Sequence, residues 1–527
     1  MFSIAFYIGI FSYLMFSLGL LNILHVPIVL SVSLLYVSAI IYVEQNNIYS
    51  SSIQCITFIK SLPKGLRLLF FLVLLQAGTN LLGTLGPELS FDGLWYHLTL
   101  PKIYLLHHKI FHIPGSLLYY SDMPKLAEMM YVLNLSMGSE IFAKLSHFSF
   151  GVLTLISLYK ISRKFFSKKL SFLAVIIFYS NLVVGWMSVT AYIDLTRTFF
   201  ELLSFWAFLN WLEKKESKWL IESGCLLGLA ISTKLLAIGS IIIFLMLIAL
   251  VSKEKIRDSL MLIVTSLLIP LPWFIFSYVY NNNPVYPFFT KTYPVGLAIE
   301  LINPVRFLQD VWIVLAKSAD PINPLYLLFL PLGVFLYKQF TKEIKIIAQY
   351  CFLAMIVWYV TPRTGGGRFL LPYLPVFSLL SIAVLAQTKK NLKKVFVGLI
   401  IFFSLFSVVY RFGANSKYIP VLLGLQTKSD FLSKHLNFSY GDFYDIDEYF
   451  KMTIKPTDRV LLYEFHNLYY VDFPFIDSTW VKRGDRFNYI ATQNSGIPGR
   501  FEYWNLIYSN PKTLVKLYSL GGQEWMY

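Results

Sequence analysis

Charge and cysteine are both scarce in this chain. Charged residues make up 14% of its 527 residues, and the first 43 positions contain no Lys, Arg, Asp or Glu. Because no basic segment precedes the first apolar run, this stretch predicts membrane helices and not a cleaved signal peptide. The three cysteines, Cys55, Cys225 and Cys351, fall in apolar runs or in an expected cytoplasmic loop, so they imply no disulfide framework.

The sequence also lacks the motifs of several enzyme classes. It contains no P-loop, no G-x-S-x-G and no H-E-x-x-H. We therefore expect no ATP-driven chemistry, and an activated lipid substrate would remove the need for it. The net charge of +16 could suggest a nucleic-acid partner, but the basic residues lie in short clusters between apolar runs. Membrane topology explains that pattern better, so we expect no nucleic acid to bind.

Long apolar runs are what the chain has instead. It is 56% hydrophobic, and runs of about 20 apolar residues mark an integral membrane protein. A bilayer core leaves an open backbone no other way to satisfy its hydrogen bonds, so the runs should be helices. We predict about 13 transmembrane helices. The expected spans are 2–23, 26–43, 68–86, 140–159, 170–187, 195–212, 219–233, 236–251, 259–279, 324–338, 346–360, 369–387 and 395–411.

The loops between these spans predict the orientation. One alternating set of loops holds about 21 Lys and Arg in about 62 residues, and the other holds about 9 in about 114. By the positive-inside rule the basic set is cytoplasmic. The N-terminus is then cytoplasmic, and the C-terminus faces the periplasm or the cell exterior across a plasma (inner) membrane. The basic loops are 44–67, 160–169, 213–218, 252–258, 338–345 and 388–394.

Three regions on the expected outer face are longer than a connector needs to be, namely 87–136, 280–323 and the tail 412–527. Sites on a membrane scaffold usually lie on such segments. The tail is polar throughout, with a helix-like stretch at 442–452 and a strand-like stretch at 459–464. It therefore predicts a small α/β domain outside the membrane. Its aromatic residues suit either acceptor binding or its own core.

A carboxylate, Asp92, follows the early span 68–86 and is followed by Trp95, Tyr96 and His97. Asp92 could simply cap a helix that begins near Gly93, since Asp is a favoured N-cap. A second acid, Asp194, stands at the outer end of another span. Its neighbour three residues on is Arg197, so a plain ion pair within one helical turn is the simpler interpretation. Two acids beside an outward cavity are nevertheless candidates for a general base and its partner.

The first long loop holds further candidates, in the stretch Ser121–Glu128. Pro124 is placed to start a helix, which Asp122 or Met123 would cap and in which Glu128 would lie one turn along. Both acids could also bind a substrate. The nearby histidines are more often interfacial side chains than ligands, because a metal site needs three or four converging donors. A divalent metal is possible but not indicated by the sequence.

Basic residues complete the set of candidates. Lys234 interrupts an apolar pair of spans, and Arg363 and Arg368 lie in the turn 361–368, which contains three consecutive glycines. The two arginines and the backbone N–H groups of this turn could bind a phosphate. Alternatively, the turn is only flexible and its arginines extend toward the membrane surface.

In this order, the stretches FDGLWYHLTLPKIY, MPKLAEMMY, AYIDLTRTFFELLSFWAF, STKLLAI, NPVYPFF and GRFLLPYLP resemble a known family. They are similar to the membrane glycosyltransferases of the GT-C fold, in particular the bacterial relatives of protein O-mannosyltransferases and of the lipid A aminoarabinose transferases. The resemblance covers residues 68–411. It implies an all-α, polytopic GT-C-like membrane protein. The chain departs from the family in the two extra N-terminal helices of residues 1–67, because many members begin directly with the span that leads to Asp92. The extracytoplasmic α/β domain in 412–527 is only loosely similar to the family's external C-terminal domains.

The resemblance also implies roles. Asp92 matches the family's favoured catalytic base and Asp194 its second acid, while Asp122 falls where relatives have an acid beside a Lys-Pro pair. Here Met123 replaces that Lys, so Lys125 is the candidate for its phosphate contact. Further substrate-binding candidates are Tyr96, His97, Glu128, Lys234, Arg363 and Arg368.

The implied reaction moves a sugar, a hexose or a pentose, from a polyprenyl-phosphate carrier to an acceptor hydroxyl on the outer face of the membrane, with inversion. The acceptor could be an envelope glycan, a lipid or a protein, and the sequence names neither it nor the sugar. Two alternatives remain open, a transporter or flippase of lipid-linked glycans and an O-antigen polymerase or ligase. A transporter would need the phosphate-binding arginines but no essential base.

Overall fold

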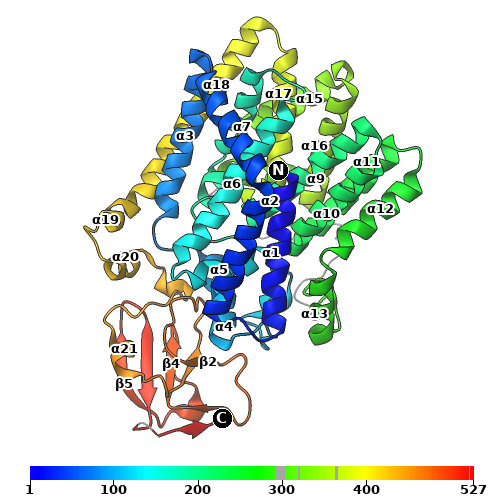
Figure 1. The fold of residues 1–527 in the computed structure, drawn as a ribbon. Coiled ribbons are helices and arrows are strands. Elements are labelled where there is room, and N and C mark those ends of the chain that lie inside the picture. Colours follow the sequence, from blue (N-terminus) through cyan, green and yellow to red (C-terminus); the bar gives the residue numbers. More distant parts are fainter. Residues whose placement is uncertain (291–302, 319–320, 362–365, 522) are drawn as a thin grey trace.

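The computed structural model describes residues 1–290, 303–318, 321–361, 366–521 and 523–527. Helices form one large bundle, and a small sheet domain made by the end of the chain packs against one end of it (Figure 1). The main helices are α1 (Phe2–Leu20), α2 (Val26–Lys60), α3 (Lys64–Thr84), α4 (Thr99–His107), α5 (Leu126–Ser136), α6 (Glu140–Ser162), α7 (Lys168–Tyr179), α8 (Leu182–Met187), α9 (Asp194–Lys214), α10 (Ser217–Thr233), α11 (Gly239–Val251), α12 (Lys255–Leu268), α13 (Leu271–Asn281), α14 (Pro304–Trp312), α15 (Leu325–Leu336), α16 (Lys342–Val360), α17 (Leu374–Gln387) and α18 (Lys390–Asn415).

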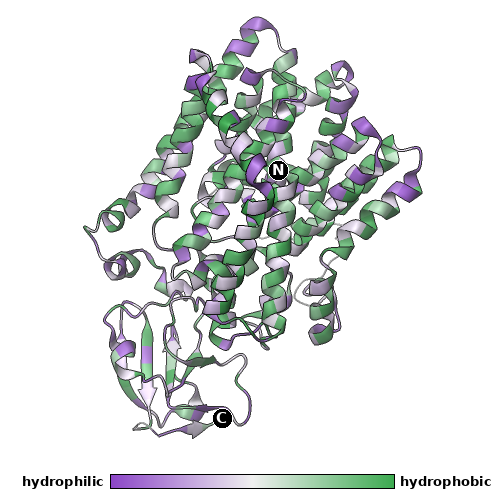
Figure 2. Cartoon of the chain, viewed as in Figure 1, coloured by the Kyte–Doolittle hydropathy of each residue, from purple (hydrophilic) through white to green (hydrophobic). Residues whose placement is uncertain are grey.

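Apolar residues run the length of most bundle helices, and hydrophilic residues gather at their ends and on the sheet domain (Figure 2). Within the described ranges, six helices are long and apolar enough to cross a membrane, or seven if α12 and α13, which bend by 64° at a short break, form one span. Three shorter apolar helical segments lie beside them. The chain is thus a helical, multi-pass membrane protein, although the expected number of about 13 spans is not confirmed.

The expected spans 26–43 and 170–187 are among those whose bounds differ in the structure. The expected span 26–43 is only the first half of α2, so residues 44–60, predicted as loop, are helical. No proline or glycine interrupts that stretch, and the helix stops only before Pro63. The expected span 170–187 is divided between α7 and α8. The Asn181 side chain donates to the carbonyls of Ile177 and Phe178, which satisfies two acceptors at the end of α7.

The C-terminal domain is built on a mixed sheet of five strands in the order β2-β1-β4-β6-β5, where β1 pairs in parallel with β2 and β4, and β6 pairs antiparallel with β4 and β5. This confirms the small sheet domain, and the stretch predicted as a strand forms β1. The predicted helix 442–452 shrinks to the short α21 (Tyr449–Thr453). The strands are β1 (Val460–Tyr463), β2 (Phe475–Asp477), β3 (Arg486–Phe487), β4 (Tyr489–Gln493), β5 (Asn505–Asn510), β6 (Val515–Ser519) and β7 (Trp525–Met526), with β3 and β7 in a separate pair.

A loop of this domain is attached to the bundle beside α4. The Lys102 ammonium on α4 donates to the carbonyls of Tyr469 and Val471 at 2.7 and 2.9 Å and to the Asp472 carboxylate at 2.6 Å. The Tyr469 N–H in turn donates to the Leu94 carbonyl at 3.2 Å. One cation therefore fixes the loop 466–472 against the segment that follows Asp92.

Replacing Lys102 by Met should loosen this attachment. Three acceptors lose their shared charged donor, which corresponds to about 2 kcal/mol. Hydrogen exchange of residues 466–472 in the intact protein should become faster, while exchange in β4 stays unchanged. Lys451→Met, which removes an exposed ammonium on the same domain, is the matched control. Equal exchange in the two variants would contradict the assigned role of Lys102.

Candidate active site

Asp92 lies at the start of η1 (Gly93–His97), a short π-helical turn. Its side chain does not cap this turn. The carboxylate instead accepts from Arg368 Nη1 at 2.5 Å and from the Tyr96 hydroxyl at 3.2 Å. The capping interpretation of Asp92 is therefore wrong, and Asp92 is part of an ionic cluster.

Asp194 is the first residue of α9 and is almost fully buried. Its two oxygens accept from Lys234 Nζ at 2.7 Å and from Arg368 Nε at 2.8 Å. The alternative partner, Arg197, bonds Glu201 at 2.6 Å instead. The simple ion pair within one helical turn is thus not formed.

Arg368 is the residue that joins the two acids. It lies in the short 3-10 helix η7 (Gly367–Phe369), and its guanidinium also stacks over the Tyr192 ring at 4.3 Å. Phe369, the next residue, carries the Lys234 ammonium over its ring at 5.3 Å. Two acids and two cations from four separate parts of the chain therefore form one partly shielded cluster with a formal charge of zero. Arg363, the other predicted arginine, lies outside the described residues.

The charges around Asp92 determine its ionisation. Burial raises the pKa of a carboxyl group, but the Arg368 guanidinium and the nearby His97 oppose this, so the pKa of Asp92 lies below its ordinary value. Asp92 is consequently ionised at neutral pH. As long as Arg368 bonds it, Asp92 is a weak base.

The other predicted residues of the first loop fall into two groups. His97 and Glu128 meet in a fully buried pair, with 2.7 Å between Nδ1 and Oε1. Asp122, expected as a helix cap, instead accepts from His112 at 2.9 Å and from Asn281 of α13 at 3.0 Å. Helix α5 begins at Leu126, two residues later than the proline signal predicted, so that Asp122 lies outside it.

Lys125, predicted to contact phosphate, is occupied elsewhere. Its ammonium donates to the carbonyls of Tyr120, Ser121 and Met123 at 3.2, 2.5 and 2.5 Å. Burial lowers the pKa of Lys125 to about 8. Three carbonyl partners use all three N–H donors of an ammonium. The structure gives no support to a phosphate contact by Lys125.

Among the residues that the structure describes, no group of three or more His, Cys, Asp or Glu side chains is arranged to hold a metal ion. His108, from the cluster of loop histidines, stacks on His25 with ring centres 3.9 Å apart. A role for a divalent metal remains a prediction without a structural counterpart.

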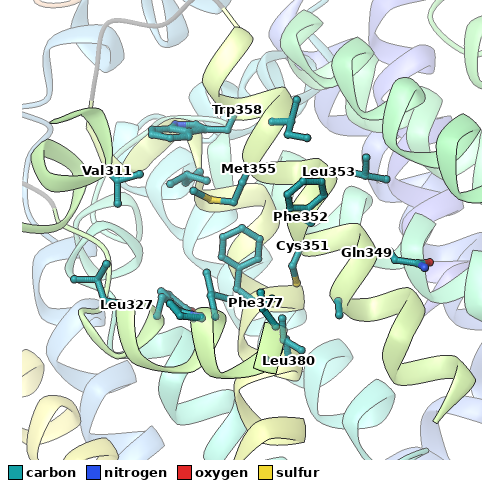
Figure 3. Close-up of a pocket in the computed structure, with 18 of the residues that line it drawn as sticks. Val311, Leu327, Gln349, Cys351, Phe352, Leu353, Met355, Trp358, Phe377 and Leu380 are labelled. Carbon is teal, nitrogen blue, oxygen red and sulfur yellow. The ribbon is translucent and has the colours of Figure 1, made fainter. Parts of the chain in front are cut away.

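An apolar cavity of about 900 Å³ lies next to the ionic cluster around Arg368, between α11, α14, α15, α16 and α17 (Figure 3). Its wall includes Phe352, Met355 and Trp358 of α16, and it reaches Leu370, two residues after Arg368. Val334 and Phe352 line it and are 74% and 67% exposed, so the cavity opens on the flank of the bundle. The sequence signalled no such cavity, because its lining is indistinguishable from other apolar helix surface.

Three comparisons relate this geometry to known proteins. Residues 129–276 match the model of the family described as dolichyl-phosphate-mannose-protein mannosyltransferase. No curated protein sequence matches the chain significantly. The crystal structure of ArnT from Cupriavidus metallidurans bound to undecaprenyl phosphate is similar with a TM-score of 0.59 at 12% identity, over 86% of this chain and 97% of that one.

The chain has the GT-C fold. The same ArnT in its apo state is similar with a TM-score of 0.57 at 11% identity, over 87% of this chain and 98% of that one. The oligosaccharyltransferase AglB from Archaeoglobus fulgidus gives a TM-score of 0.46 at 12% identity, over 81% and 69% of the two chains. The GT-C resemblance stated from the sequence motifs is confirmed.

The structure thus assembles part of the predicted set at one point of the GT-C fold. Asp92, Asp194, Lys234 and Arg368 meet, with Tyr96 beside them. His97 and Glu128 pair with each other, Lys125 bonds carbonyls of its own loop, and Asp122 bonds His112 of that loop and Asn281 of α13. Sequence reasoning missed Glu88, a buried acid beside Asp92; its only sequence signal is its place four residues before Asp92.

The pKa of Asp92 leads to a prediction about stability. A carboxyl whose folded pKa is lowered stabilises the fold above its ordinary pKa of about 3.9, and this contribution disappears as pH falls through the lower folded pKa. The Tm difference between wild type and Asp92→Asn in detergent should therefore be constant near neutral pH and shrink below about pH 4. Asp430→Asn, at an exposed helix start, controls for a change of charge. A gap that persists unchanged to pH 3 would contradict the prediction.

Proposed function

We propose that this chain is a glycosyltransferase that moves a sugar from a polyprenyl-phosphate carrier to an acceptor hydroxyl on the outer face of the cell's plasma membrane. The observation that carries the proposal is the place of Arg368. It lies between two acids, and two residues later Leu370 lines an apolar cavity that opens on the flank of the bundle. A lipid-linked phosphate needs a cation at the end of an apolar channel. The family match and the undecaprenyl phosphate bound to the similar ArnT support this assignment.

The carrier would bind in two parts. Its polyprenyl chain would enter sideways from the bilayer and fill the apolar cavity, and its phosphate would reach Arg368 and Lys234. Each cation still has N–H groups to offer, because Lys234 uses one donor on Asp194 and Arg368 uses Nε and Nη1. The phosphate would therefore join the cluster without displacing every existing bond.

Asp92 would act as the general base. The acceptor oxygen attacks the anomeric carbon as its proton passes to Asp92, and the bond from that carbon to the phosphate oxygen breaks on the opposite face, which inverts the configuration. The leaving phosphate keeps the electron pair, and Arg368 and Lys234 stabilise its charge. As the phosphate draws Arg368 toward itself, the pKa of Asp92 rises, so donor binding turns a weak base into a stronger one.

The surroundings of the base suggest where the acceptor lies. Tyr96 donates to Asp92, and the C-terminal domain reaches the same segment, because the His466 ring stacks on Phe91 at 4.7 Å and contacts the tilted Trp95 ring at 4.3 Å. The acceptor would approach between this domain and η1. The orientation inferred from the loop charges, with a cytoplasmic N-terminus, agrees with this arrangement.

Asp92→Asn should lower transfer by about 10²–10⁴-fold, the usual contribution of a general base, without loss of folded protein. The measurement is release of polyprenyl phosphate from a defined lipid-linked sugar by purified protein in nanodiscs. Asp430→Asn is the matched control and should keep full activity. Wild-type protein that moves the donor intact across a vesicle membrane, without releasing polyprenyl phosphate, would instead identify a transporter.

Filling the cavity should raise the KM for long polyprenyl carriers but not for short ones. Gly333 lines the cavity, and a Cβ there would meet Leu380 at an ordinary 3.5 Å, so Gly333→Phe places a ring in the cavity without strain in the backbone. The KM for a long polyprenyl carrier should rise about tenfold, equal to about 1.4 kcal/mol. The KM for a carrier of two or three isoprene units should change little.

Gly398→Phe is the control for this experiment, because a Cβ added at that glycine on α18 would meet no atom of another part of the chain within 4 Å. If Gly333→Phe weakens long and short carriers equally, the cavity does not hold the polyprenyl chain.

A further inference from the structure

Glu88 is a buried carboxylate with no part in the reaction described above. It lies between α3 and η1, is 1% exposed, and is four residues from Asp92. Its Oε1 accepts from the backbone N–H groups of Leu89 and Ser90 at 2.9 and 2.7 Å, and its Oε2 accepts from the N–H of Ala191 at 2.5 Å. Both oxygens thus serve as acceptors for the backbone.

These contacts connect two distant loops. Leu89 and Ser90 lead to Asp92, whereas Ala191 leads to Asp194, about a hundred residues later in the chain. A second bond joins the same two loops with the donor on the other side, from the Asp92 N–H to the Tyr192 hydroxyl at 3.2 Å. Glu88 is therefore placed where it sets the spacing between the two loops that carry the acids.

The sequence provides the space for this carboxylate. A Cβ at Gly93 would lie 2.5 Å from Ser90 Oγ and 3.2 Å from Glu88 Cδ, so a larger residue there would push the Glu88 side chain away. The absence of a side chain at Gly93 therefore leaves room for the Glu88 carboxylate beside the segment that leads to Asp92.

The loop before Asp194 is held from its other sides as well. Thr84 Oγ1 donates to the Ser188 carbonyl at 2.8 Å, and the Tyr131 hydroxyl donates to the Tyr192 carbonyl. His147 contacts both ends, with the Thr190 carbonyl 2.9 Å from its Nδ1 and the Leu195 N–H donating to its Nε2 at 2.9 Å. With this loop fixed to the bundle, the Glu88 contact transmits its position to Asp92.

We propose that Glu88 is a positioning residue that fixes the distance at which Arg368 bridges Asp92 and Asp194. The inference rests on the proposed function only in one respect, namely that the distance between the two acids affects sugar transfer. An ionised carboxylate is required, because both oxygens accept and a Gln side chain would turn an N–H group toward a backbone N–H in either orientation. An unpaired backbone N–H is the result of any such substitution.

The first test is Glu88→Gln, with steady-state kinetics at several pH values. We expect kcat to fall about a hundredfold, while the KM for the carrier changes less than about threefold, because the cavity is untouched. The acid limb of the kcat/KM profile should move to higher pH. With Arg368 farther from Asp92, the pKa of the base is lowered less, and more of the base is protonated at a given pH.

Two matched variants accompany it. Asp477→Asn removes another buried acid, which accepts from the N–H and the hydroxyl of Thr479 in the C-terminal domain, and it should keep wild-type kinetics. Tyr131→Phe removes one hydroxyl from the loop before Asp194 and should shift the acid limb in the same direction by a smaller amount. If Glu88→Gln does not fold, Tyr131→Phe is measured in its place.

Hydrogen exchange does not require enzymatic activity, so it tests this inference independently of the proposed function. In Glu88→Gln either the Ala191 amide or the Leu89 and Ser90 amides lose their acceptor, so hydrogen exchange at residues 188–195 or at 89–92 should accelerate at least tenfold while exchange in α6 is unchanged. If the wild-type chain transfers no sugar, the proposed function fails, and the exchange result still decides whether Glu88 joins the loops. Wild-type kinetics, pH profile and exchange in Glu88→Gln would overturn the inference.

Discussion

The site depends on one guanidinium between two carboxylates. Arg368 bonds Asp92 and Asp194, which precede it in the chain by 276 and 174 positions. Charges in a bundle of apolar helices are tolerated only when they are paired, because an unpaired one costs several kcal/mol. The need to satisfy these charges therefore draws the start of η1, the start of α9 and the short helix η7 to a single point, and Leu370, two residues after Arg368, lines the cavity beside α16 and α17.

The small domain at the end of the chain belongs to this arrangement. Lys102 holds its loop against α4, and Tyr470 donates to the Glu88 carbonyl at 3.0 Å. Through these bonds the domain contacts the segment that carries Asp92. Under the proposed function, an acceptor hydroxyl would meet the base near this contact.

Much of this could be predicted from the sequence, and the limits have physical causes. Apolar runs predicted a helical membrane protein, because bilayer thickness imposes a long uniform pattern, and ordered motifs predicted the GT-C fold. The same runs predicted about 13 spans, a number that is not confirmed, and composition does not record the break between α7 and α8 beside Asn181. Asp92, Asp194, Lys234 and Arg368 were all chosen as candidates because charge is rare in this chain. Their pairing was not predictable, since Arg197 was the nearer partner of Asp194 in sequence. Glu88 was missed because its partners are backbone N–H groups, which no residue pattern reveals.

The formal neutrality of the cluster has a consequence for turnover. If the donor is a sugar phosphodiester, it brings one negative charge, whereas the carrier that remains after transfer is a phosphate monoester with close to two charges at neutral pH. Arg368 and Lys234 would then hold the spent carrier more firmly than the fresh one. Product inhibition by polyprenyl phosphate follows from this difference, and departure of the carrier into the bilayer, rather than cleavage of the sugar bond, would limit the rate.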